Sequence, residues 1–169
     1  MQTASAQIAE EWKDFFVAAA GASGTLVGLV IVAISVNLQR ILEHPQLPSR
    51  GGATVAALVL ILVCSMAGLI PQTNAALAIE ILVSGLLAWL LQIWSARQII
   101  VAYSKSRRML RKSVIGIAIG QIKVIPFIVG GISLFFHQGN ALYWIAWGMI
   151  ATFILSVFNT WVLLVEILR

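Results

Sequence analysis

Long runs of apolar residues alternate with short polar segments along the whole chain. A transmembrane helix needs about 20 consecutive, predominantly apolar residues. Five runs have about this length, and they end at charged residues, at a proline or at a short polar turn. The pattern therefore predicts an all-α protein, a single membrane domain over residues 1–169 built as a polytopic bundle of five transmembrane helices. The predicted spans are residues 15–39, 53–70, 75–100, 114–136 and 141–164.

Two other membrane-related interpretations of these runs fail. Strands of a transmembrane barrel alternate apolar and polar residues over segments of about 10 residues, whereas these runs are continuous. A secretory signal peptide begins with a positive segment and has a short apolar core. Here the first run is long and follows Glu10, Glu11, Lys13 and Asp14, so we expect it to be a retained span.

The composition excludes the soluble classes of protein. Of the 169 residues, 60% are hydrophobic and only 10% are charged, and the mean hydropathy is +0.98. Soluble domains contain about 25% charged residues, and disordered chains contain few hydrophobic ones. Five spans leave no length for a separate soluble catalytic domain. The single cysteine, Cys64, excludes an internal disulfide and a CxxC metal site.

The basic residues predict the orientation of the helices, because cytoplasmic loops collect Lys and Arg. Loop 101–113 is strongly basic, and Arg40 and Arg50 fall on the same side. The turns at 71–74 and 137–140 contain neither Lys nor Arg. We therefore expect a multi-pass protein of the plasma (inner) membrane with the N-terminus outside and the C-terminus inside. This topology accounts for the net charge of +5 without a nucleic-acid partner. The cations expected to contact anionic lipid headgroups or a partner are Arg97, Lys105, Arg107, Arg108, Arg111 and Lys112.

Small and hydroxylated residues gather on one side of the first predicted span. Helices in lipid associate through small residues that permit close approach, and Gly24 and Gly28 form a GxxxG pair. Ser23 and Asn37 lie on the opposite side, so we expect this helix to be buried on both sides. The stripe either packs against other helices or lines a pore. At 100° per residue, it contains Gly21, Gly24, Thr25, Gly28, Val32, Ser35 and Gln39.

Polar or small stripes also follow three other predicted spans, which indicates a hydrated or heavily hydrogen-bonded interior. On the fourth span, Gly116 and Gly120 are expected at helix-packing positions, as are the glycines of the first. The stripes contain Glu80, Ser84, Ala88, Gln92 and Ser95 on the third span, Gly116, Gly120, Lys123 and Gly130 on the fourth, and Gly148, Thr152, Ser156, Asn159 and Glu166 on the fifth.

Two charges fall inside the predicted hydrocarbon region, where insertion of a charged residue costs about 2.5–3.5 kcal/mol. Glu80 is near the outer edge and Lys123 near mid-depth. Glu80 is either a hydrogen-bonded carboxyl near the interface or a group that attracts cations or transfers protons. Lys123 either extends toward the cytoplasm or binds or repels ions in the interior. Pro126 cannot donate a backbone hydrogen bond, which frees the carbonyl of Ile122.

The chain lacks the patterns of an enzyme. It contains no HExxH and no glycine-rich phosphate loop. His44 and His137 fall on opposite sides of the predicted membrane, and Glu80 has no second carboxylate in the interior. We therefore expect no catalytic residues, no metal site and no cofactor.

The N-terminal part of the chain resembles a known family. The segments that carry the resemblance are Trp12–Phe16, Ala20–Ala22, Gly28–Leu38, Leu47–Pro48 and the end of the second predicted span at Pro71–Gln72. They are similar to a family of small bacterial membrane proteins often labelled "modulator of FtsH protease", and they cover roughly the first 75 residues. The resemblance implies a polytopic membrane protein with a membrane protease as its partner, and it supplies no site residues.

Two functions remain open on these grounds. The polar stripes and interior charges favour an ion channel or transport pathway that is a homo-oligomer, because five helices rarely enclose a pore alone. In that case the interior polar residues are Glu80, Lys123, Ser84, Gln92, Thr25, Ser35 and Asn159. The resemblance and the basic loop favour a non-enzymatic regulator or scaffold of a membrane protease or other complex.

Overall fold

The computed structural model describes residues 2–43, 47–103, 107–136 and 139–167, and it describes only the backbone at 2–10, 40, 47, 49–50, 98–99, 102–103, 107–117, 119 and 162–167. Almost all described residues are helical, and none is in a strand. The all-α prediction is therefore confirmed for this part of the chain. The helices are α1 (Gln2–Val36), α2 (Leu38–Glu43), α3 (Leu47–Leu69), α4 (Asn74–Tyr103), α5 (Arg107–Phe135) and α6 (Ala141–Ile167).

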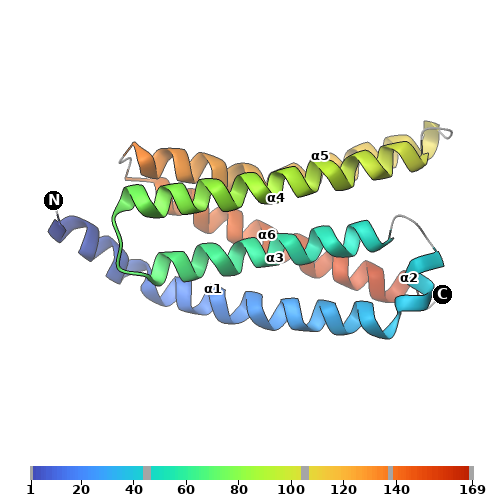
Figure 1. The fold of residues 1–169 in the computed structure, drawn as a ribbon, viewed down its shortest axis with the longest axis horizontal. Coiled ribbons are helices and arrows are strands. Elements are labelled where there is room, and N and C mark those ends of the chain that lie inside the picture. Colours follow the sequence, from blue (N-terminus) through green and yellow to red (C-terminus); the bar gives the residue numbers. More distant parts are fainter. Residues whose placement is uncertain (1, 44–46, 104–106, 137–138, 168–169) are drawn as a thin grey trace.

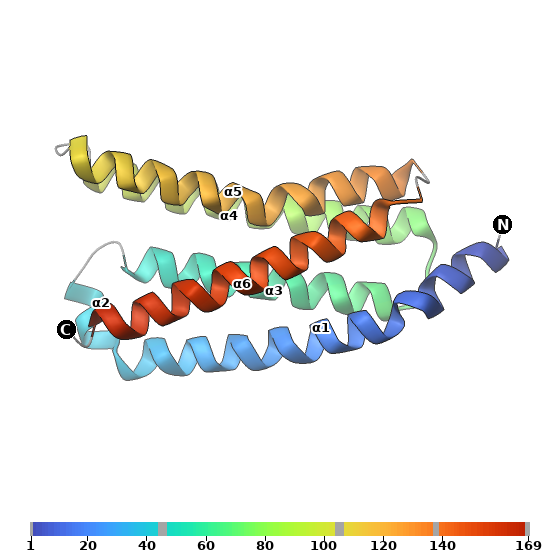
Figure 2. The ribbon, with the colours of Figure 1, turned by 180° about the vertical axis from the view of Figure 1, so that it is seen from behind.

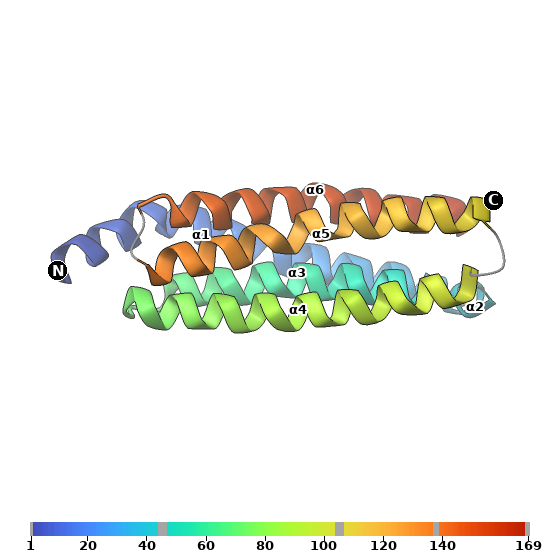
Figure 3. The ribbon, with the colours of Figure 1, turned by 90° about the horizontal axis from the view of Figure 1, so that it is seen from above.

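The five long helices lie side by side along the long axis of the molecule (Figures 1 and 2). The most extensive contacts join α1 to α3, α4 to α5 and α5 to α6, while α3 also contacts α4 and α6. Helix α1 makes only slight contact with α6. Seen from above, the chain turns back on itself at each end of the bundle (Figure 3). As a result α1 is an edge helix, whereas α5 lies between two neighbours.

Four described segments are long and apolar enough to cross a membrane: Glu11–Val36, Gly51–Leu69, Asn74–Arg97 and Ala141–Trp161. These segments are compatible with a membrane-embedded protein. In α5 the described apolar segment, Gly120–Phe135, is shorter. The whole of α5 has 29 residues and lies along α4 (Figure 3).

Several limits of the predicted spans differ from those of the observed helices. Helix α5 begins at Arg107 rather than at 114, so residues 107–113, which were expected in the basic loop, are helical. Helix α1 begins at Gln2 rather than at 15. Helix α1 ends at Val36 rather than at 39, because Asn37 interrupts it and its Nδ2 donates to the carbonyl of Ala33 at 3.0 Å. The short helix α2 follows and buries Ile41. Helix α3 begins at Leu47 rather than at 53. A helix can begin there because Pro48 lies in the first turn, where no intrahelical amide hydrogen bond is required.

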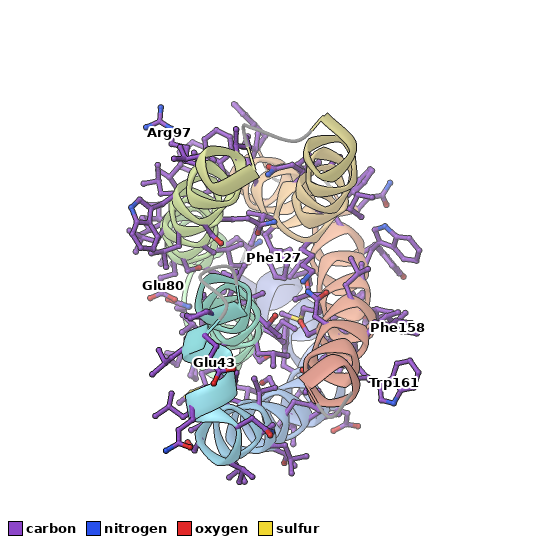
Figure 4. The ribbon with its side chains drawn as sticks, turned by 90° about the vertical axis from the view of Figure 1, so that its right-hand side faces the viewer. Glu43, Glu80, Arg97, Phe127, Phe158 and Trp161 are labelled. Atoms are coloured by element: carbon purple, nitrogen blue, oxygen red, sulfur yellow. The ribbon has the colours of Figure 1, made fainter. Side chains whose placement is uncertain are left out.

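Large side chains from several helices fill the centre of the bundle around Phe127, which points to the middle of the molecule (Figure 4). Glycines on the neighbouring helices leave room for its ring: a Cβ at Gly148 would lie 3.0 Å from Phe127, and one at Gly85 would lie 3.6 Å from its Cβ. Leu58, Ile61, Ile145 and Met149 are fully buried in the same core. The interior of the single chain is thus densely packed around α5.

Candidate functional site: a polar layer between α4, α5 and α6

Lys123 is buried in the bundle, with only 6% of its surface exposed. Its backbone is tied to α6, because the hydroxyl of Thr152 donates to the Lys123 carbonyl at 3.2 Å. The sequence indicated that Pro126 frees the carbonyl of Ile122. The hydroxyl of Thr152 instead donates to the carbonyl of the following residue, Lys123. Helix α6 approaches closely here, since a Cβ at Gly148 would lie 3.0 Å from the Pro126 ring.

Helices α4 and α5 meet through polar side chains just beside Lys123. The indole Nε1 of Trp89 donates to Oε1 of Gln121 at 2.8 Å. The amide of Gln92 lies over Gly120, in the space that a Cβ there would occupy. Gly120 therefore packs as expected of a helix-contact glycine, and its missing side chain admits a polar amide.

Two buried hydroxyls lie one turn further toward the N-terminus of α5. Ser156 is one turn beyond Thr152 on α6, is 1% exposed, and its Oγ has no hydrogen-bond partner among the described atoms. Ser95 is one turn beyond Gln92 on α4 and is 7% exposed. We call this set the polar layer: Gln92, Ser95, Gln121, Lys123, Thr152 and Ser156.

Glu80 lies outside the packed core of the single chain. Its side chain is exposed and points away from the core (Figure 4). It accepts a hydrogen bond of 2.8 Å from Nε2 of Gln72, which also donates to the carbonyl of Ala67 at 2.9 Å. The polar stripe of α4 drifts by about 60° between Glu80 and Ser95, because its spacing exceeds 3.6 residues per turn. The stripe is consequently exposed at Glu80 and buried at Ser95.

Three other predicted interior residues, Thr25, Ser35 and Asn159, are exposed in the single chain. Thr25 donates to the carbonyl of Gly21 at 2.9 Å, and Ser35 donates to that of Ile31 at 2.8 Å, so each hydroxyl is bonded within its own helix. Ser84 is half-buried. Its hydroxyl donates to the carbonyl of Glu80 at 2.7 Å and lies 3.6 Å from Sγ of Cys64.

The glycine stripe of α1 faces outward, so its predicted packing does not occur within the chain. Gly21, Gly24 and Gly28 are exposed, and a Cβ built on any of them meets nothing within 4 Å. The opposite side of α1 is the one that packs, with Phe16 and Ser23 almost fully buried. Within the single chain only one side of α1 is buried, because α1 lies at the edge of the bundle and has its main neighbour, α3, on one side.

The remaining predicted residues lie largely beyond what the structure describes. Arg97 is exposed and extends from α4 away from the bundle (Figure 4). Lys105 lies outside the described residues. The backbone alone is described at Arg107, Arg108, Arg111, Gly116 and Lys112.

The sequence pattern placed Thr152 and Ser156 on a polar stripe but did not identify them as site residues. The spacing from Gly148 to Thr152 to Ser156 placed these residues on one face. No sequence signal links Trp89 to Gln121, because that contact depends on the register between α4 and α5. A comparison with protein-family models, with curated proteins and with solved structures finds no match for this chain.

Proposed function

We propose that the protein is a small integral membrane protein that assembles as a homo-oligomer and forms an ion channel or transport pathway. The observation that carries this proposal is the exposed stripe of Gly21, Gly24 and Gly28, opposite the side of α1 that packs against the bundle. The centre of the single chain is filled by Phe127 and its neighbours. A pathway therefore requires either a boundary between subunits or a rearrangement of the helices.

A second copy of the chain is the partner that this stripe suits best. Small residues allow two helices in lipid to approach closely, and hydrogen bonds across the contact add to their association. Thr25 and Ser35 lie on the same side as the glycines. In an oligomer they bring hydroxyls to the subunit contact, where such groups can also line a polar path.

The proposal includes five spans, with the N-terminus outside, in the plasma (inner) membrane. Helix α5 supports the fifth span because it lies along α4 and, at 1.5 Å per residue, is long enough to cross a bilayer. The basic residues in the first turns of α5 support the orientation, since this end of α5 lies away from the Trp12–Tyr143 contact (Figure 1).

Ion flux through liposomes tests the transport function. We expect purified protein to carry ions down an imposed gradient, and we expect the double variant Gly24→Leu, Gly28→Leu to lose this flux because bulky residues separate the subunits. The variant should still fold, since both side chains extend into open space. Liposomes that stay impermeable to cations and to anions, under tension and across pH, contradict the proposal.

Cysteine cross-linking tests the oligomer separately. In a Cys64→Ala background, Gly24→Cys should give disulfide-linked dimers in membranes. Leu29→Cys is the matched control, because Leu29 is 58% exposed on the same helix but lies about 90° from the centre of the stripe. Equal cross-linking at both positions contradicts a specific contact through the glycines.

A second candidate is a regulator or scaffold of a membrane protease or other complex. It is favoured by the resemblance of the N-terminal part and by the exposure of Arg97 on α4, at the end of the bundle where the basic first turns of α5 lie (Figure 1). Neutral replacement of Lys105, Arg107, Arg108, Arg111 and Lys112 should then abolish co-purification of that partner. Association that is unchanged, with the topology intact, contradicts this candidate.

A further inference from the structure

Lys123 has no counter-charge in the core of the described structure. The carboxylates whose side chains are described are Glu11, Asp14, Glu43 and Glu80, and all of them are exposed. Glu80, in the segment Asn74–Arg97, is held by Gln72. An ammonium group buried away from water is costly without a negative partner. The surroundings of Lys123 therefore favour a negative group that the described side chains do not supply.

Ser156 supplies a second, independent sign of a ligand at the same level of the bundle. Its hydroxyl is buried and has no partner among the described atoms. A buried polar atom without a hydrogen bond costs about 1–3 kcal/mol, so it calls for a partner that the described residues do not provide. A bound ion would satisfy this hydroxyl as well as Lys123.

The register of the helices places Lys123 and Ser156 at neighbouring levels of the bundle. Thr152 contacts the Lys123 carbonyl across the antiparallel α5–α6 pair, so Ser156 lies opposite the turn of α5 that precedes Lys123. Side chains on a helix lean toward its N-terminus, which directs the Lys123 stem over this same turn. The amide of Gln92 reaches this turn from α4, because it lies over Gly120.

The groups gathered at this turn are hydrogen-bond donors: an ammonium, a hydroxyl and an amide. Such a set suits an anion. Lys123 is the one charged residue buried in the described part of the chain, and a single positive charge neutralises one negative charge.

We propose that Lys123 and Ser156 form a binding site for a small monovalent anion, of which chloride is the probe, with Gln92 as an additional donor. The proposed binding of the anion does not depend on any transport activity of the protein. The extension that the ion carried by the channel is this anion rests on the function proposed above.

Anion-dependent stability tests the site on the full-length protein in detergent. The unfolding temperature is measured while potassium chloride replaces potassium gluconate at constant ionic strength. We expect a saturable rise for the natural chain and none for Lys123→Met. In Ser156→Ala, the chloride concentration giving half of the rise should increase about tenfold, as expected for losing a hydrogen bond to a charged group.

Two further variants keep this test decisive. Ser65→Ala removes another buried hydroxyl, one that contacts Sδ of Met149 at 3.9 Å, and it should leave the chloride response unchanged. Lys123→Arg retains the positive charge and should retain the response even if Lys123→Met does not fold. A natural chain that shows no chloride response, or a Ser156→Ala variant whose response equals that of the natural chain, overturns the site.

Flux measurements separate this inference from the proposed function. In liposomes we expect chloride flux from the natural chain and its loss in Lys123→Met. Cation flux that is independent of Lys123 overturns the extension to anion transport and leaves the channel standing, while the stability measurement alone decides the anion site. Chloride-stabilised protein without any flux overturns the channel and leaves the anion site standing.

Discussion

The glycines of α1 and those of α5 and α6 occupy opposite kinds of surroundings. A Cβ at Gly24 or Gly28 meets nothing within 4 Å, whereas one at Gly130 would lie 2.6 Å from Ile145 and 3.1 Å from the carbonyl of Ala141. A Cβ at Gly131 would lie 2.8 Å from Leu82. Glycines in similar apolar segments therefore make close contacts between helices in α5 and lie on an open surface in α1.

The difference arises from the place of each helix in the bundle. Helix α5 has extensive contacts with both α4 and α6, so a residue without a side chain is needed wherever their backbones come near. Helix α1 has one extensive neighbour, α3, and Phe16 packs on Gly68 at that contact. The outward glycines of α1 are available to a partner, whereas Gly130 and Gly131 of α5 already contact other helices of the same chain.

The largest loss of stability should come from removing the large side chain that packs against a glycine of α6. Phe127→Ala removes the fully buried ring that lies against Gly148, and we expect a loss of about 3–5 kcal/mol in the free energy of unfolding. Phe158→Ala is the matched control on the bundle surface, where the side chain is 61% exposed (Figure 4). Denaturant titration in detergent measures both, and equal losses would contradict the packed centre.

Adding one methyl group to a glycine of each kind sharpens the comparison. Gly130→Ala forces the new methyl against the backbone of Ala141 and Ile145, so we expect destabilisation of about 1–3 kcal/mol. Gly24→Ala places its methyl in open space, where the better helix propensity of Ala gives a change of at most about 1 kcal/mol in the favourable direction. The free energy of unfolding of both variants is measured by denaturant titration under the same conditions. A larger loss of stability in Gly24→Ala than in Gly130→Ala would contradict our assignment of the packed and open faces.

The smallest effect concerns the polar contact between α4 and α5. A double-mutant cycle with Trp89→Phe and Gln121→Leu should give a coupling energy of about 0.6 kcal/mol, which is typical of hydrogen bonds between helices in membranes. The cycle Thr25→Val with Gln121→Leu is the control and should give no coupling, because Thr25 is bonded within α1. A coupling of zero at Trp89 and Gln121 would show that their 2.8 Å contact does not stabilise the pair.

The polar stripes show which parts of the candidate site could be predicted from the sequence. On α5 and α6, helical spacing grouped Lys123 with Gly130, and Thr152 and Ser156 with Gly148, all of which the structure buries. Asn159 belonged to the same group on α6 and is exposed. On α4 the same reasoning placed Glu80 with Ser95, although the first is exposed and the second is buried. Periodicity identifies residues that share a face, but a stripe that drifts around its helix meets different neighbours at its two ends.

From the sequence alone it followed that the chain is helical, that the long helices end within a few residues of the predicted limits, and that the composition suits a membrane. These properties depend on local apolar length and on helix-breaking residues. The sequence could not determine which face of α1 is covered, which carbonyl near Pro126 is bonded, or which hydroxyl lacks a partner. Those properties depend on the register and order of helices that are distant in sequence. In lipid, where apolar surface can lie on either side of a helix, only the tertiary structure decides them.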